Sequence, residues 1–157
     1  MSRITLDQAQ TIVSATLKEG RSLGLKPLSA AVLDAGGHLV ALAREDNSSN
    51  LRPQIAIAKA SGALALGVSS RVIGEMAIER PTFINAAAGL NPAGIVPAAG
   101  GVLIRDQNGS VIGAVGVTGD TSDDASSDSA RILRWVARKF KQYRQRPRGA
   151  RAWHRCS

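Results

Sequence analysis

The chain has 157 residues, 44% hydrophobic and 20% charged, which suits one domain with a single core and excludes a chain disordered throughout. Aromatic residues make up only 3%, which excludes a base-stacking platform in the main body, and the single cysteine, Cys156, excludes a disulfide framework and a Cys-based zinc cluster within one chain. The net charge is +8, but residues 1–130 sum to −2, while residues 131–157 hold ten Lys and Arg and no acid.

The first elements expected along the chain are a helix and a hairpin. Residues 5–8 (TLDQ) have the form of a capping box, so a helix should begin there. Two runs that favour β-structure, residues 28–34 and 38–44, flank a Gly-Gly turn. This pattern predicts two antiparallel strands.

The middle of the chain is predicted to be helical. Pro53 suits the first turn of a helix that runs to about Leu66 and is closed by Gly67. This helix is rich in alanine, so a sheet or another helix can approach it closely. A shorter helix is expected over 71–79, and residues 83–97 should be irregular or briefly helical because of their Pro and Gly breakers.

A second hairpin is expected over residues 101–105 and 110–118, joined by a turn that contains Asn-Gly. Its second strand carries Gly113 and Gly116, which weaken a strand unless another backbone approaches closely or the strand bends. Hairpins in place of βαβ crossovers predict an α+β domain with an antiparallel sheet covered by helices.

Three segments resemble the GlcG/HbpS family of small haem-binding-like proteins. They are the first hairpin (residues 31–41, AVLDAGGHLVA, with RED at 44–46), a lysine-bearing helix segment (residues 57–60, IAKA) and the glycine-rich closing hairpin (residues 97–104, PAAGGVLI, and 109–119, GSVIGAVGVTG). The resemblance implies a five-stranded antiparallel sheet flanked by helices, in a layered domain like that of profilin or PAS proteins. It also implies a family domain over residues 1–125, assembly into dimers up to octamers, and haem as a candidate cofactor.

Lys59 is the most informative single residue. It lies in an apolar helix, where desolvation would lower the pKa of its amine and make it a base, a Schiff-base former or an anchor for an anion. The alternatives are a lysine that reaches solvent, or one paired with Asp46 or Glu75. Arg44 and Asp46 accompany this lysine in the resemblance.

Other residues complete a candidate ligand pocket around Lys59. Gly100 and Gly101 could offer backbone N–H groups to a carboxylate, with Thr118 as a hydroxyl donor on the neighbouring strand. The alternative interpretation of the glycines is sheet curvature. Together these positions predict a site for an anionic or aromatic ligand.

Metal and haem ligands are scarce in this sequence. His38 follows the Gly-Gly turn, where a solvated histidine is the alternative to an axial ligand, and Met76 suits core packing. Asp120 and Asp124 are weak candidates for binding a hard cation and equally suit a helix N-terminus.

The basic segment over residues 126–157 departs in composition from everything before it. A basic amphipathic helix fits residues 130–143, and polyanion or membrane-surface binding is its functional interpretation. A tail without a selected function is the other. Nucleic acid is therefore expected as a partner only through this segment. Since no leader-like or eighteen-residue apolar run occurs, we expect a cytoplasmic protein without a membrane span.

Two functions follow as hypotheses. The first is a small-molecule-binding protein for haem, another tetrapyrrole or a small carboxylate. The second is a lyase or isomerase that acts on a small aromatic or carboxylated metabolite, with Lys59, Arg44 and Asp46 at its site.

Overall fold

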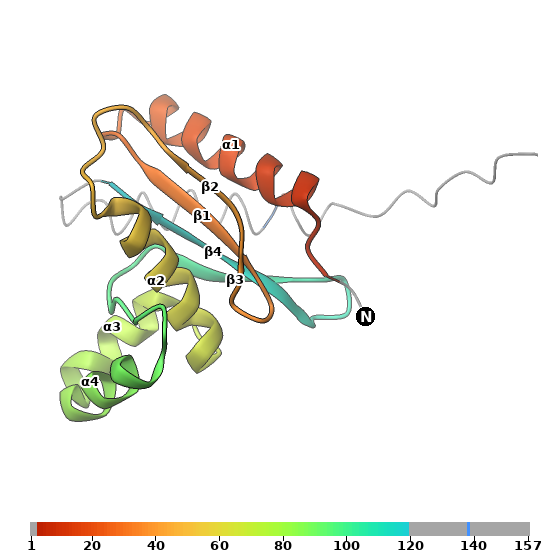
Figure 1. Cartoon of the computed structure of the whole chain (residues 1–157). Helices are drawn as coiled ribbons and strands as arrows, with labels where there is room; N and C mark the ends of the chain where they lie inside the picture. The colour runs from red at the N-terminus through yellow and green to blue at the C-terminus, as the bar shows by residue number, and fades with distance from the viewer. Residues whose placement is uncertain (1–2, 120–137, 139–157) are drawn as a thin grey trace, which may run out of the picture.

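Two antiparallel hairpins lie side by side in one sheet, with helices on both faces, in the computed structural model, which describes residues 3–119 and residue 138 (Figure 1). This arrangement confirms the α+β class. In chain order the elements are α1 (Leu6–Ser22), β1 (Ser29–Asp34), β2 (Leu39–Arg44), α2 (Arg52–Leu66), α3 (Ser70–Glu79), α4 (Pro81–Leu90), β3 (Gly101–Arg105) and β4 (Val111–Thr118).

The sheet has the order β2-β1-β4-β3, and every neighbouring pair of strands is antiparallel. The expectation of five strands is wrong for residues 3–119, where the sheet has four. Both predicted hairpins form, but the chain between them folds as α2, α3 and α4 with connecting turns, so it adds no strand. The first and last strands, β1 and β4, become the central pair.

Local signals set the helix ends. At the start of α1 the Gln8 N–H donates to Thr5 Oγ1 at 3.2 Å and the Thr5 N–H donates to Gln8 Oε1 at 3.0 Å, which confirms the capping box. Pro53 lies in the first turn of α2, and Gly67 ends that helix with a φ of +70°. Pro81 begins α4, which occupies much of the stretch predicted to be irregular or briefly helical.

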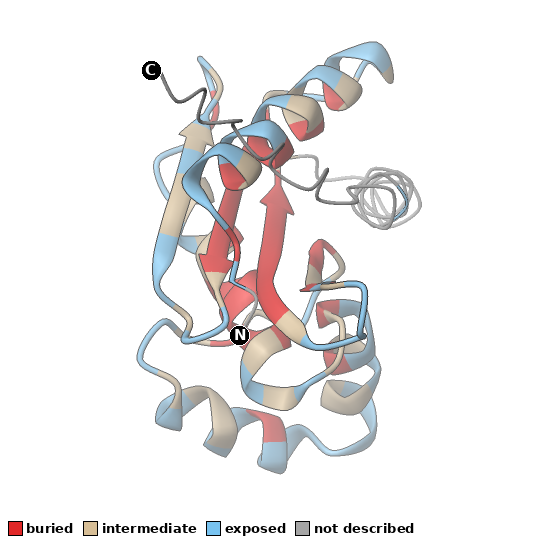
Figure 2. Cartoon of the chain, turned by 90° about the vertical axis from the view of Figure 1, so that its right-hand side faces the viewer, coloured by how far each residue is buried: buried red, intermediate tan, exposed pale blue. Residues whose placement is uncertain are grey.

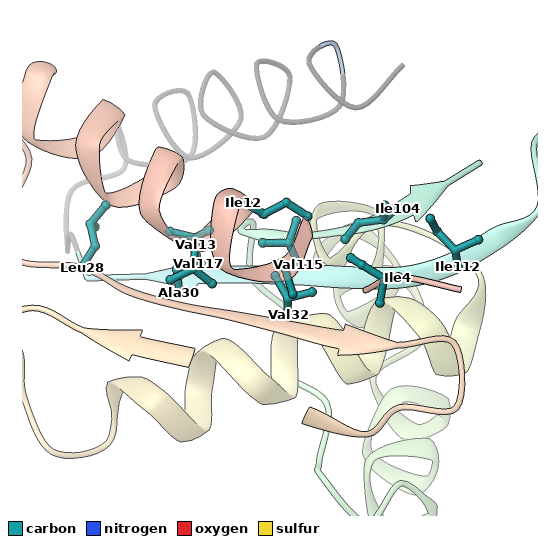
Figure 3. Packing of buried hydrophobic residues seen from close by; sticks show 11 residues of the cluster. Ile4, Ile12, Val13, Leu28, Ala30, Val32, Ile104, Ile112, Val115 and Val117 are labelled. Atoms are coloured by element: carbon teal, nitrogen blue, oxygen red, sulfur yellow. The ribbon is translucent and has the colours of Figure 1, made fainter. Parts of the chain in front are cut away.

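The largest apolar cluster lies between α1 and one face of the sheet (Figure 3). Ile12 and Val13 of α1 pack there against strand residues that alternate along β1 and β4, such as Val32 and Val115. Figure 2 shows the two central strands almost entirely buried, whereas the residues of the edge strand β2 are intermediate or exposed. Alternate residues of β1 and β4 therefore point toward α1.

Helix α2 packs closely against the other face of the sheet (Figure 1). A Cβ atom at Gly116 would overlap the carbonyl oxygen of Ala56, and one at Gly101 would overlap the carbonyl oxygen of Lys59. This confirms that the glycines of the second hairpin and the small residues of the helix permit a close backbone approach. The middle of α2 is thereby fixed over β3 and β4.

Within the described residues, no single helix is long and apolar enough to cross a bilayer, and α2 with α3 passes such a test only as a pair bent by 75°. Apart from Arg138, the segment 126–157 lies outside the described residues. The basic helix over 130–143 and the binding roles considered for this segment stay predictions.

Candidate ligand-binding site

Lys59 is a buried cation in the middle of α2. Its residue surface is only 8% exposed, and its Nζ donates to the carbonyl oxygen of Val117 at 3.4 Å. Among the described residues no carboxylate lies within ion-pair distance of it, so neither Asp46 nor Glu75 is its partner. A buried ammonium with only one long hydrogen bond is costly to keep charged.

The space that Lys59 occupies is left by Gly100. This residue has a φ of +127°, and a Cβ atom there would lie 3.1 Å from Lys59 Nζ and would overlap the Val117 carbonyl oxygen. The Val117 N–H donates to the Gly100 carbonyl at 2.8 Å, just before β3 begins. Gly100 thus turns the chain into β3 and leaves room for the amine beside β4.

Arg52 is a second cation at the site, and the sequence pattern alone did not identify it. Its Nη1 donates to Thr118 Oγ1 at 2.9 Å. Arg52 and Lys59 are seven residues apart in α2, a spacing that places two side chains on one helix face. This spacing is the sequence signal that could have identified Arg52 as a neighbour of Lys59. Arg52 directly precedes Pro53 at the helix start, and the sequence analysis gave it no role.

The electrostatic environment lowers the pKa of Lys59 from 10.5 to about 8. Burial is the main cause because it penalises the charged form, and the positive charge of Arg52 adds to it. Near pH 8 the amine is therefore divided between its charged and neutral forms. A bound anion would shift this balance toward the ammonium.

The backbone amide of Gly101, considered above as a donor to a ligand, already has a partner. Its N–H donates to the buried Ser70 Oγ at 2.7 Å, which ties the start of β3 to the start of α3. The Gly101 amide is therefore not free to bind a ligand, whereas the role considered for the Gly100 amide stays a prediction. Thr118 is buried, and its hydroxyl accepts the hydrogen bond from Arg52.

Arg44 and Asp46 lie at the margin of this region. Arg44 pairs with Ser29 in the sheet, and Ser29 pairs with Thr118, so these three residues share one row and one face. The Arg44 guanidinium is turned toward the next loop, where Nη1 donates to the Ser48 carbonyl at 3.3 Å. Asp46 is exposed, and no hydrogen bond or ion pair in the described part of the chain joins either residue to Lys59.

The metal-ligand candidates lie elsewhere. His38 is exposed, and its Nδ1 lies 3.2 Å from Asp34 Oδ1, in the turn between β1 and β2. This turn follows the end of β1 opposite to Ser29, about 17 Å along the strand. Asp120 and Asp124 lie outside the described residues. Within residues 3–119 no group of three His, Cys, Asp or Glu side chains could hold a metal ion.

The positions of the possible iron ligands test whether this site could bind haem, which the family resemblance implies as a cofactor. Met76 packs in an apolar cluster with Ile73 and Ile84, and His38 lies in the distant turn. The described residues around Lys59 therefore do not fit iron ligation by histidine or methionine. Their cationic groups fit a carboxylate instead.

The comparisons with known proteins identify relatives of the whole domain. The family described as "Haem degrading protein HbpS-like" matches residues 4–130. No curated protein matches the chain.

Three solved structures are similar over most of their length. The Klebsiella pneumoniae protein ORFY is 25% identical with a TM-score of 0.75, and the match covers 92% of this chain and 95% of that one. A double mutant of Streptomyces reticuli HbpS is 22% identical with a TM-score of 0.73, and the match covers 88% of each chain. A PduOC:heme complex is 16% identical with a TM-score of 0.73, and the match covers 87% of this chain and 94% of that one. The family match over residues 4–130, together with the fold shared with these structures, places the chain in the HbpS-like family, a haem-binding-like class.

Proposed function

We propose that this chain is a small-molecule-binding protein that holds the carboxylate of its ligand with Lys59 and Arg52, where α2 meets the end of β4. The observation that carries the proposal is the burial of Lys59 without a carboxylate partner among the described residues. Two cations on one helix face repel each other, and an anion between them would stabilise both. A carboxylate matches the donor geometry of Arg and Lys.

Haem and small carboxylates are the two ligand classes to test. The name of the matching family and the heme complex of the PduOC relative favour haem. A haem bound at this site would be held through its propionate carboxylates, since Lys59 and Arg52 supply cations. A small aromatic or aliphatic carboxylate would use the same two groups.

The test compares two probes and three variants of the full chain. Hemin is followed by its Soret band, and benzoate by calorimetry. Lys59→Met and Arg52→Gln should each weaken binding of the probe that binds, by about tenfold or more, because each removes a charged hydrogen bond. His38→Ala serves as the matched control and should leave binding unchanged. The proposal would be overturned if His38→Ala lost binding while Lys59→Met kept it. It would also be overturned if the wild-type chain bound neither hemin nor benzoate.

The second candidate function is a lyase or isomerase in which Lys59 acts with Arg44 and Asp46. The pKa of about 8 favours it, because an amine that is partly neutral near that pH can serve as a base. The test is turnover of a panel of hydroxy and oxo acids, followed by NMR. Turnover that is lost in Lys59→Ala and reduced in Asp46→Asn, with unchanged unfolding curves, would support this candidate. Turnover that persists in Lys59→Ala would contradict it.

A further inference from the structure

The heads of Arg52 and Lys59 end beside consecutive residues of β4. Arg52 Nη1 is 2.9 Å from Thr118 Oγ1, and Lys59 Nζ is 3.4 Å from the Val117 carbonyl oxygen. Consecutive Cα atoms are about 3.8 Å apart, so the two contacts bring the heads toward one short stretch of strand. A ligand that meets both heads through different groups therefore needs those groups close together.

The two heads have different chemistry. The guanidinium of Arg52 is a planar cation whose paired N–H donors match the two oxygens of a carboxylate. The amine of Lys59 is buried with no acidic partner among residues 3–119, and the neutral form of such an amine carries a nucleophilic lone pair. A carboxylate toward Arg52 and an electrophilic carbon toward Lys59 would satisfy both.

The segment that leads into β3 consists of small residues. Gly100 has no side chain beside Lys59 Nζ, and residues 97–99 before it are Pro, Ala and Ala, of which the first two are exposed. Residues 97–100 therefore carry no side chain larger than that of proline.

We infer that Lys59 forms an imine with a 2-oxo carboxylate whose carboxylate pairs with Arg52. This inference rests on the proposed function for the carboxylate and adds a covalent step. The lone pair of the neutral amine attacks the C2 carbonyl carbon, a C–N bond forms, and the carbonyl oxygen takes a proton. The resulting carbinolamine loses that oxygen as water and leaves a C=N bond, with no net oxidation or reduction.

The test is reductive trapping on the full chain. Pyruvate and cyanoborohydride are incubated with the protein at pH 7, and digestion with mass spectrometry locates the carboxyethyl group. Exposed Lys18 and Lys26 are internal controls. An amine with a pKa near 8 has a neutral fraction at least a hundredfold larger at this pH than one near 10.5, so roughly tenfold preferential labelling of Lys59 is expected even with restricted access.

Three further measurements assign the label to the site. Acetone has the carbonyl without the carboxylate, so it should label Lys59 several-fold less than pyruvate. Arg52→Gln should reduce pyruvate labelling to the acetone level, and benzoate should protect Lys59 from pyruvate. Labelling of Lys59 no greater than that of Lys18 would overturn the imine. Binding of benzoate without labelling would refute the imine alone, whereas absence of both labelling and any carboxylate binding would refute the proposed function as well.

Discussion

The ammonium of Lys59 donates to the carbonyl oxygen of Val117 across 58 residues of sequence, and so joins the middle of α2 to the end of β4. The contact depends on two features of the fold. Glycines at the helix–sheet contact bring the backbones close, and Gly100 leaves the volume that the amine fills. The consequence is a cation whose burial is enforced by packing, which is unusual for lysine.

Lys59→Met is expected to stabilise the protein at neutral pH. The folded-state pKa of about 8 lies below the unfolded value of 10.5, so the unfolded state binds more protons between these values. The free energy of unfolding of the wild type should therefore rise with pH through this window. Methionine does not titrate, so the free energy of unfolding of Lys59→Met should exceed that of the wild type by about 2–3 kcal/mol at pH 7. This difference should close toward pH 10.5.

Urea unfolding of both proteins at pH 7, 8.5 and 10 measures this difference. Lys18→Met, at an exposed position of α1, controls for the loss of one lysine. A Lys59→Met curve parallel to that of the wild type at all three values would show that the amine is solvated in the folded state.

Gly100→Ala should destabilise the fold by about 2–3 kcal/mol. An alanine would have to adopt a φ of +127°, and its Cβ would meet the Val117 carbonyl oxygen and the Lys59 side chain. Gly89→Ala is the matched control, because Gly89 lies in α4 with nothing within 4 Å of the added Cβ. That control should be neutral or up to about 1 kcal/mol more stable. Equal unfolding midpoints for the two variants would contradict the turn described here.

Ser70→Ala should cost about 1–3 kcal/mol, because it leaves the buried Gly101 N–H without its acceptor. Chemical unfolding measures the cost, with Ser14→Ala on the exposed face of α1 as a control that should change stability by less than about 0.5 kcal/mol. Amide hydrogen exchange at Gly101 should also accelerate. Unchanged exchange at Gly101 would mean that another acceptor holds this amide.

Asp34 should make the first hairpin sensitive to acid. Its pKa is lowered, chiefly because its carboxylate accepts a hydrogen bond from the His38 N–H, with further help from the Gly36 N–H. The stabilisation is complete above the unfolded pKa of 3.8 and is lost as the pH falls through the lower folded value. Thermal unfolding from pH 5 to pH 2 should therefore decline more steeply for the wild type than for Asp34→Asn. Parallel declines would show that the turn does not depend on this charge.

Much of the fold could be predicted because it depends on neighbours in sequence. The Thr5 capping box, the Asn-Gly turn with Gly109 at a φ of +82°, and Gly67 at the end of α2 are local signals. The number of strands could not be obtained in this way. It was taken from the family resemblance, and two hairpins supply only four strands in residues 3–119.

The candidate site could likewise be predicted only in part from local sequence. The sequence singles out Lys59 because a lysine is unusual in an alanine-rich helix. How deeply this lysine is buried depends on how closely α2 approaches Gly116 and Gly101. Arg52 was missed because its role depends on Thr118, which lies 66 residues away. Such contacts are fixed by tertiary packing, which a linear pattern does not encode.

The most direct test of the account is the titration of Lys59 in the presence of a carboxylate. Protein labelled with ¹³C-lysine is titrated by NMR with and without benzoate, and Lys59→Met identifies the Cε resonance of Lys59. The account predicts a titration midpoint near 8 for the free protein and a higher midpoint with benzoate, because a bound anion favours the ammonium. A midpoint near 10.5 in the free protein, or one that benzoate leaves unchanged, would contradict it.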